Sequence, residues 1–175
     1  MVKQTIAIVG AEGKTGSVFA LGLIQLNLYR LLLLSEDEGG LDNLSRQILL
    51  LSPGADIELI SCLKDGCWEA DLIIVDVPHA SIQEVADKIR EVSTQKIVFG
   101  ILKNEYNNLS PVSAAREWQQ LLPNAKVVVA LNDLNTTEMV IAGNDRESVL
   151  SIAGITKKLG FQPMITDSLS VIKPL

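Results

Sequence analysis

Close to the start of the chain stands Ile6-Ala7-Ile8-Val9-Gly10-Ala11-Glu12-Gly13-Lys14-Thr15-Gly16. Four apolar residues typical of a buried strand lead into a turn with glycine at every third position. Glycine has no Cβ, so the backbone can turn sharply and approach a phosphate closely. The apolar segment from Val18 to Leu26 predicts a helix whose first N–H groups favour an anion. This order predicts a site for the pyrophosphate of a dinucleotide; a turn that binds nothing is the alternative.

A second interpretation of the same residues is a P-loop. Gly13-Lys14-Thr15 resembles the end of such a loop, and Leu72-Ile73-Ile74-Val75-Asp76 resembles a Walker B strand. A P-loop has another glycine five residues before the glycine of its Gly-Lys-Thr. That position is Ile8, inside the predicted strand. The spacing therefore excludes a P-loop, and Asp76 is interpreted as a strand-end residue rather than a magnesium ligand.

The composition indicates one α/β domain over residues 1–175. With 47% apolar but only 4% aromatic residues, the chain can bury a large aliphatic core. No apolar run reaches the roughly 18 residues of a membrane helix, and no signal peptide precedes the first strand, so we expect a cytoplasmic protein. Two cysteines and one histidine predict neither a disulfide framework nor a metal site. The net charge of −6 argues against a nucleic-acid partner.

Apolar, strand-like runs alternate with helix-like segments along the chain. The expected strands are Thr5–Val9, Leu31–Leu34, Asp56–Ile60, Leu72–Val77, Lys96–Ile101 and Lys126–Leu131, with Met139–Ala142 and Met164–Thr166 extending the sheet. Runs that are apolar on both faces are typical of a parallel sheet covered by helices on each side. The pattern predicts a Rossmann-type, doubly wound, mostly parallel sheet in a single α/β domain.

Three patterns mark the ends of the expected helices. Ser81-Ile82-Gln83-Glu84 has the spacing of a capping box, and Ser110-Pro111 places a cap before a proline at the first helical position. Lys157, Lys158 and Gly160 are typical of a helix C-terminus.

Several segments together resemble a known family. They are the Gly10–Gly16 turn, Ala70-Asp71-Leu72-Ile73-Ile74-Val75-Asp76-Val77-Pro78, Ser113-Ala114-Ala115-Arg116-Glu117, Leu122-Pro123-Asn124-Ala125-Lys126-Val127-Val128, Ala130-Leu131-Asn132, Ile141-Ala142-Gly143-Asn144-Asp145 and Leu159-Gly160-Phe161-Gln162-Pro163. The chain resembles the Rossmann proteins of the deazaflavin-dependent NADP oxidoreductase type. It is also similar to the N-terminal domains of pyrroline-5-carboxylate reductase and prephenate dehydrogenase.

This resemblance implies hydride transfer between a nicotinamide cofactor and a second bound ring or small carbonyl or imine acceptor. The cofactor-binding residues expected from the glycine turn, the second strand and the "VP" segment are Gly10, Ala11, Glu12, Gly13, Lys14, Thr15, Gly16, Ser35, Glu36, Val77 and Pro78. The chain departs from the family pattern after the fifth strand, at Gly100-Ile101-Leu102-Lys103-Asn104-Glu105, and between Asn132 and Met139, where the family carries a longer insertion.

A third departure concerns the choice of cofactor. The family has Ser-Arg after the second strand, where it holds a 2′-phosphate, and this chain has Ser35-Glu36-Asp37. Glu36 lies twenty positions after Gly16, where an acidic residue accepts hydrogen bonds from the ribose hydroxyls and repels a phosphate. The pattern therefore favours NAD over NADP. A solvated acidic loop is the alternative interpretation.

Two side chains are candidates for catalysis because they follow apolar strands at the expected carboxyl edge of the sheet. His79 could donate a proton or hydrogen bond beside the hydride, and Asn132 could orient a substrate. A loop histidine and a strand-end amide are the structural alternatives. Ser81 is interpreted first as a helix cap.

Two function classes follow from these observations. One is a nicotinamide-dependent oxidoreductase acting on a small-molecule substrate. The other is a catalytically silent dinucleotide-binding module or redox sensor. The substrate site would be completed by strand-end loops or by a neighbouring subunit of a homodimer.

Overall fold

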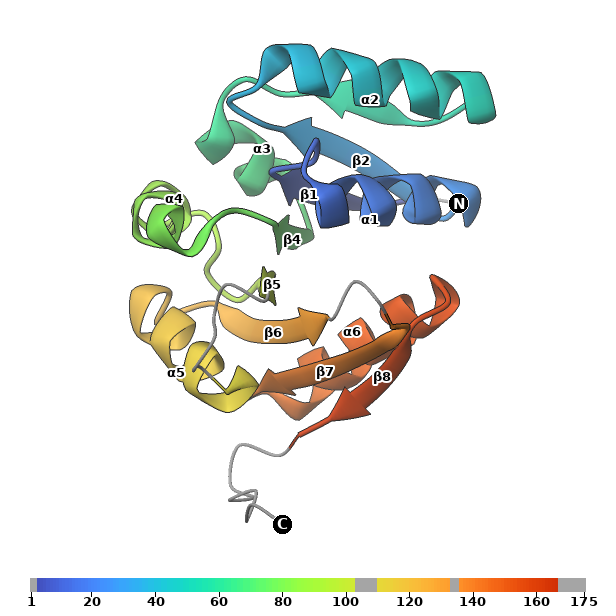
Figure 1. Cartoon of the computed structure of the whole chain (residues 1–175). Coiled ribbons are helices and arrows are strands. Elements are labelled where there is room, and N and C mark those ends of the chain that lie inside the picture. Colours follow the sequence, from blue (N-terminus) through green and yellow to red (C-terminus); the bar gives the residue numbers. More distant parts are fainter. Residues whose placement is uncertain (1–2, 103–109, 133–135, 167–175) are drawn as a thin grey trace.

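The computed structural model describes residues 3–102, 110–132 and 136–166, whose strands form one sheet. The strand order is β3-β2-β1-β4-β5-β6-β7-β8. Strands β1 to β6 run parallel, β7 runs antiparallel to β6, and β8 runs parallel to β7. The bounds are β1 (Gln4–Val9), β2 (Tyr29–Leu34), β3 (Ile57–Leu59), β4 (Leu72–Val75), β5 (Ile97–Leu102), β6 (Lys126–Asn132), β7 (Glu138–Gly143) and β8 (Gln162–Ile165). The predicted Rossmann-type, mostly parallel sheet is confirmed (Figure 1).

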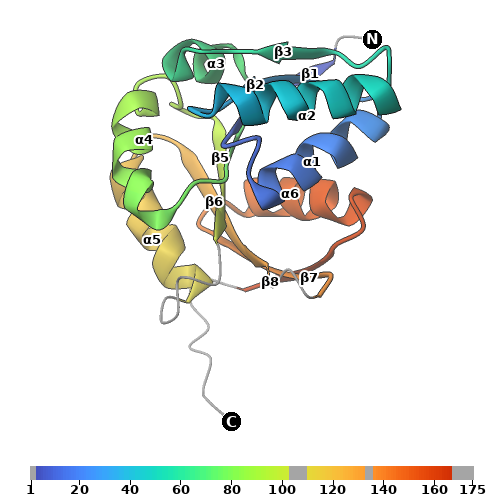
Figure 2. The ribbon, with the colours of Figure 1, turned by 45° about the horizontal axis from the view of Figure 1, so that its top comes forward.

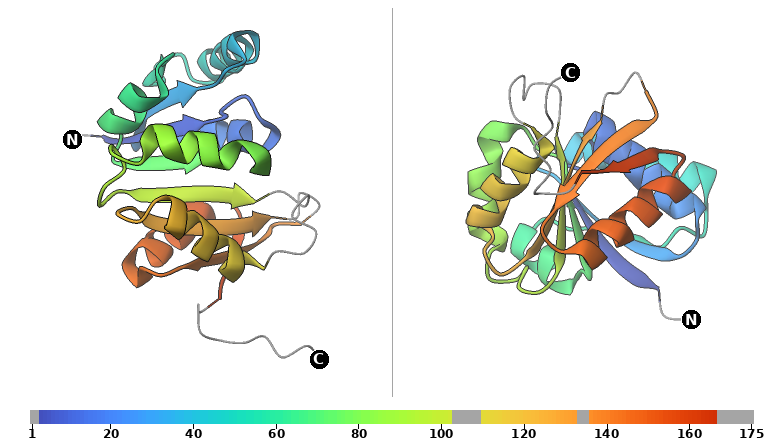
Figure 3. Two further views of the ribbon diagram at one scale, coloured as in Figure 1. Left: turned by 90° about the vertical axis from the view of Figure 1, so that its left-hand side faces the viewer. Right: turned by 90° about the horizontal axis from the view of Figure 1, so that it is seen from below.

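Helices cover both faces of the sheet (Figures 2 and 3). One face carries α1 (Lys14–Gln25), α2 (Glu38–Leu51) and α6 (Arg146–Lys158), and the other carries α3 (Leu63–Glu69), α4 (Ile82–Ile89) and α5 (Pro111–Leu121). A short 3₁₀ turn, η1 (His79–Ser81), precedes α4. Within the described ranges, none of the helices has the length and apolar character needed to cross a membrane.

The central strands are apolar on both faces, which explains this two-sided cover. In β1, Ile6 and Ile8 pack under one helix layer, while Ala7 and Val9 pack under the other, and all four are buried. Successive side chains of a strand point to opposite faces, so a strand of this composition needs helices on both sides.

Two of the three predicted helix-end patterns form as expected. The Ser110 hydroxyl accepts the N–H of Ser113 at 3.1 Å, with Pro111 in the first turn of α5. Gly160, just after α6, has a φ of +91°.

The predicted capping box at Ser81 is wrong. Ser81 has helical dihedrals (φ −93°, ψ −7°) and its side chain makes no capping hydrogen bond, because η1 leads directly into α4. Glu84 instead accepts a hydrogen bond from Lys88 at 2.6 Å. An N-cap side chain needs an extended backbone to reach the first free N–H groups.

The strand order places the switch in winding direction between β1 and β4. Chain connections run outward from β1 on one side and from β4 on the other. In such sheets, ligands bind outside the carboxyl ends of the strands at the switch point. The Gly10–Gly16 turn and the residues that follow β4 meet there.

Candidate functional site

Close packing within the loop and against the residue after β4 explains the three glycines. Gly10 has a φ of +77°, and a Cβ there would lie 2.1 Å from the carbonyl oxygen of Asp76. A Cβ on Gly13 would lie 2.8 Å from Oδ2 of Asp76, and one on Gly16 would lie 2.4 Å from the carbonyl oxygen of Gly10. Each position is too close to backbone or a buried carboxylate for a larger residue.

The loop leaves several backbone N–H groups available to a ligand. Gly10 and Ala11 donate to the carbonyl of Leu34 at 2.9 and 3.2 Å, and Gly13 donates to Gly10 at 3.0 Å. The hydrogen bonds of the described residues leave three N–H groups of this loop without a protein acceptor: those of Glu12, Lys14 and Thr15. Helix α1 begins at Lys14 with no acidic residue in its first turn, so its N-terminus attracts an anion.

Asp76 lies behind this loop and was not predicted as part of the site. It is 3% exposed, and its Oδ2 accepts the N–H of Gly16 at 2.7 Å. The charged residue directly after the apolar run of β4 is the sequence signal that could have drawn attention to it. It links the end of β4 to the first turn of α1.

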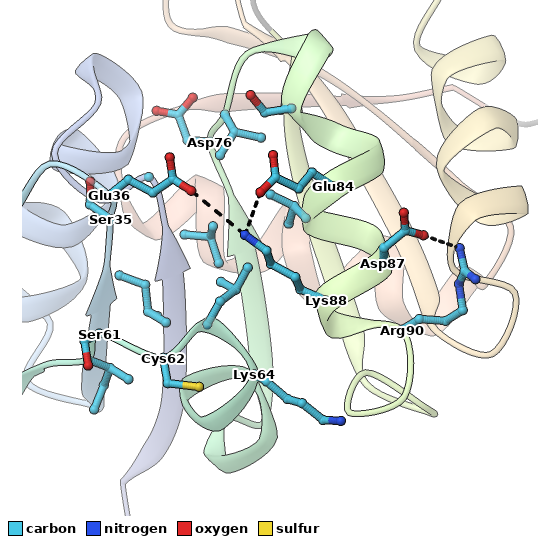
Figure 4. A pocket seen from close by; sticks show the side chains of 18 of the residues that line it. Ser35, Glu36, Ser61, Cys62, Lys64, Asp76, Glu84, Asp87, Lys88 and Arg90 are labelled. Atoms are coloured by element: carbon cyan, nitrogen blue, oxygen red, sulfur yellow. Dashed lines mark hydrogen bonds and ion pairs between the residues drawn. The ribbon is translucent and has the colours of Figure 1, made fainter.

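A cavity of about 770 Å³ opens beside the loop, between the ends of β1 and β2 and helix α4 (Figure 4). Five predicted cofactor residues line it: Gly10, Glu12, Ser35, Glu36 and Val77. Its apolar lining comes from the ends of four strands and from α3 and α4: Val9, Leu34, Ile60, Leu63, Val77 and Val85. The dimensions and mixed lining are typical of a small-molecule site.

The other predicted cofactor residues, Ala11, Gly13, Lys14, Thr15, Gly16 and Pro78, are not among the side chains that line the cavity. The first five belong to the loop and the first turn of α1, next to the lining residues Gly10 and Glu12. Thr15 is 4% exposed, and Lys14 and Pro78 are exposed.

The three residues after β2, Ser35, Glu36 and Asp37, make different contacts. The Ser35 hydroxyl accepts the N–H of Asp37 at 2.8 Å, and the Asp37 carboxylate caps α2 by accepting the N–H of Gly40 at 3.0 Å. Glu36 extends into the cavity opening, with a side chain that is 95% exposed. Ser35 and Glu36 line the cavity, and Figure 4 shows the carboxylate of Glu36 pointing across it toward Lys88.

The cations on the far wall of the cavity are paired with acids. Lys88 donates to Glu84 at 2.6 Å and lies 4.0 Å from Oε1 of Glu36. The hydrogen bond to Glu84, with a smaller contribution from Glu36, raises the pKa of Lys88. Two further pairs join Arg90 to Asp87 at 2.8 Å and Lys64 to Glu91 at 2.7 Å. Each of the three cations that line this wall, Lys64, Lys88 and Arg90, therefore has an acidic partner; Figure 4 shows the pairs of Lys88 and Arg90.

The structure does not bring the two predicted catalytic residues into this cavity. His79 lies in η1, and its Nε2 is 3.1 Å from Oε1 of Glu117 on α5. Asn132 ends β6, is 5% exposed and has a buried Oδ1 that accepts no hydrogen bond from the described residues. Neither lines the cavity. Of the two segments that depart from the family pattern, 100–105 and 133–138, residues 100–102 end β5 and 136–138 lead into β7, while 103–105 and 133–135 lie outside the described residues.

Comparison with solved structures finds this fold in oxidoreductases. A protein described as an F₄₂₀-dependent NADP reductase of Arthrobacter sp. FB24 is 24% identical, with a TM-score of 0.71 over 93% of this chain and 83% of that one. Pyrroline-5-carboxylate reductase of Coxiella burnetii is 14% identical, with a TM-score of 0.73 over 94% of this chain and 59% of that one.

Prephenate dehydrogenase of A. aeolicus, solved with hydroxyphenyl propionate and NAD+, is 13% identical, with a TM-score of 0.69 over 96% of this chain and 61% of that one. This chain therefore spans about three fifths of the length of the last two enzymes. No protein-family model and no curated protein sequence matches the chain. At these identities, the comparisons confirm the resemblance at the level of the fold.

Proposed function

We propose that this protein binds NAD(H) at the Gly10–Gly16 loop and transfers hydride to or from a small-molecule partner. One observation carries the proposal. Within the described residues, the N–H groups of Glu12, Lys14 and Thr15 have no protein acceptor, and Gly10 and Glu12 of the same loop line a 770 Å³ cavity at the switch point of a doubly wound sheet. This combination provides backbone donors for a pyrophosphate and an adjoining space for a nucleoside.

The cavity lining fits the adenosine end of the cofactor. Val77 and Val85 supply an apolar wall for a flat ring, and Glu36 supplies a carboxylate for ribose hydroxyls. With the cations of α4 paired to acids, the wall is better suited to hydroxyl groups than to a 2′-phosphate. These features favour NAD over NADP.

The residues proposed to take part in hydride transfer, His79 and Asn132, lie at the carboxyl edge of the sheet, as the glycine loop does. A bound nicotinamide supplies hydride chemistry, so the protein has to orient two reactants and provide a proton or hydrogen bond. Pro78 leads the chain away from β4, followed by His79, and Asn132 holds a buried acceptor at the end of β6. The structural neighbours, described as reductases and dehydrogenases, support a flavin-like, carbonyl or imine acceptor.

Calorimetric titration with NADH tests the binding site. Gly13→Val should abolish binding while the protein stays folded, because the added side chain meets the carboxylate of Asp76 and disrupts the loop. Gly154→Val is the matched control, since a Cβ on Gly154 in α6 meets nothing within 4 Å. Unchanged NADH affinity in folded Gly13→Val would contradict binding at this loop. An equal loss of NADH affinity in Gly154→Val would contradict it as well.

A catalytically silent binding module is the second candidate function. The observation that favours it is the position of His79, which pairs with Glu117 and does not line the cavity. A turnover assay with NADH and flavin or carbonyl acceptors separates the two functions. For the oxidoreductase, His79→Ala and Asn132→Ala should reduce turnover more than they weaken NADH binding. Tight NADH binding without turnover on any acceptor would support the silent module, and full activity of the double variant would remove both residues from the mechanism.

A further inference from the structure

Asp76 presents a buried negative charge to the same helix end that is proposed to bind the pyrophosphate. Its carboxylate is bonded to the N–H of Gly16 at 2.7 Å, in the first turn of α1. Four N–H groups at the start of a helix have no partner within the helix. Asp76 therefore takes the Gly16 N–H, which would otherwise be available to a bound anion such as the pyrophosphate.

The charge of Asp76 also competes with a bound anion. A helix N-terminus carries the equivalent of about half a positive charge. Two anions near the first turn are both attracted to this charge and repel each other. An anion held by Lys14 or Thr15 N–H lies within about one helical turn, ~5.4 Å of rise, of the donor that Asp76 takes. Because Asp76 is 3% exposed, water screens this repulsion only weakly.

We propose that Asp76 sets the affinity of the glycine loop for pyrophosphate and keeps it low. The inference rests on the proposed function, because it assumes that the pyrophosphate lies on this loop. Asp76 holds the loop to β4 through a hydrogen bond, and its charge opposes the ligand. These two effects are separable, because a neutral acceptor can keep the hydrogen bond without the charge.

The test is titration of wild type and Asp76→Asn with NADH, ADP and adenosine. The asparagine Oδ1 can still accept the N–H of Gly16. We expect Asp76→Asn to bind NADH and ADP about tenfold more tightly, the size of one like-charge interaction at this range. Adenosine, which has no phosphate, should bind both proteins equally. Asp76→Ser serves as a second neutral variant should Asp76→Asn fail to fold.

Asp71→Asn is the matched control. Asp71 stands just before β4, at the opposite edge of the sheet, and its Oδ2 accepts the N–H of Thr5 at 2.9 Å. The control removes the same charge and keeps the same kind of hydrogen bond, so its ligand affinities should match those of wild type. Unchanged or weaker ADP binding by the folded neutral variants, or an equal gain for adenosine, would overturn the role of Asp76 alone. Failure of wild type and variants to bind any of the three ligands would overturn the proposed function and this inference together.

Discussion

Glu36 is the side chain with the most direct bearing on cofactor choice. Ser35 and Asp37 hold the turn after β2 and the start of α2 by accepting the N–H groups of Asp37 and Gly40, and Asp37 is not among the residues that line the cavity. Among the described residues, Glu36 has one ion-pair partner, Lys88, at 4.0 Å. Its carboxylate can therefore turn toward ribose hydroxyls at little cost.

We expect wild-type protein to bind NADH at least about tenfold more tightly than NADPH, because a 2′-phosphate would face the charge of Glu36. Glu36→Gln should narrow that ratio, chiefly by improving NADPH binding. Glu38→Gln, in the first turn of α2 and outside the cavity lining, should leave the ratio unchanged. Side-by-side titrations measure both ratios, and tighter binding of NADPH by wild type would contradict the assignment.

At this scale, the sequence predicts the glycines but not the residue they pack against. The spacing of Gly10, Gly13 and Gly16 is a local property of one turn, so it can be recognised along the chain. Asp76 meets that turn only after β1 and β4 pair in the sheet. Its interpretation as a strand-end residue was incomplete, because the hydrogen bond to Gly16 joins positions sixty residues apart.

Helix ends show how local patterns succeed or fail at the scale of elements. Asp145 and Ser110 both have extended backbones and cap α6 and α5, each by accepting a backbone N–H three residues later. Ser81 has an acidic residue, Glu84, three positions later, as a capping box requires. The 3₁₀ turn η1, however, gives Ser81 helical dihedrals. The capping-box pattern does not indicate whether a 3₁₀ turn precedes the cap. The pattern alone is therefore not enough to predict a capping hydrogen bond.

The cap at Asp145 predicts a pH-dependent contribution to stability. Hydrogen bonds from the hydroxyl and N–H of Ser148 lower the pKa of Asp145 below its ordinary value of about 4. A lowered pKa in the folded state means that the contribution is complete at neutral pH and is lost as the pH falls through the folded pKa. Asp145→Ala should cost about 1 kcal/mol at pH 7.

Urea unfolding of wild type and Asp145→Ala at pH 7 and at successively lower pH measures this effect. The difference between the two proteins should shrink as the pH falls below about 4. A difference that stays constant down to the acid limit of folding would show that the carboxylate charge contributes nothing to the cap.

At the scale of the whole molecule, alternation of strands and helices was enough to predict the sheet. Apolar runs without polar alternation indicate parallel strands buried on both faces, and β1, β2, β4, β5 and β6 follow that pattern, whereas the short edge strand β3 does not. The reversal at β7 is not encoded in the hydrophobic pattern, since a buried strand has the same composition in either direction. The pattern predicted that β7 belongs to the sheet, but not its direction.

The cavity could be predicted only in part. Its glycine and β2 walls come from segments with recognisable motifs, whereas Ile60, Leu63 and the charged face of α4 carry no motif. They contribute because the strand order places the ends of β3 and β4 on either side of β2 and β1. The pairing of Lys88 with Glu84 and Glu36 likewise depends on where α4 packs.

The cytoplasmic location and the homodimer stay predictions.

The central claim is that backbone N–H groups of the glycine loop bind a dinucleotide. Titration of isotope-labelled protein with NAD+ by two-dimensional NMR tests it residue by residue, and a 19.0 kDa chain is suited to the method. We predict saturable shifts of the Glu12, Lys14 and Thr15 amide signals, with those of the buried α5 residue Trp118 unchanged. Loop signals that stay fixed at millimolar NAD+, or shifts confined to other parts of the protein, would contradict the claim.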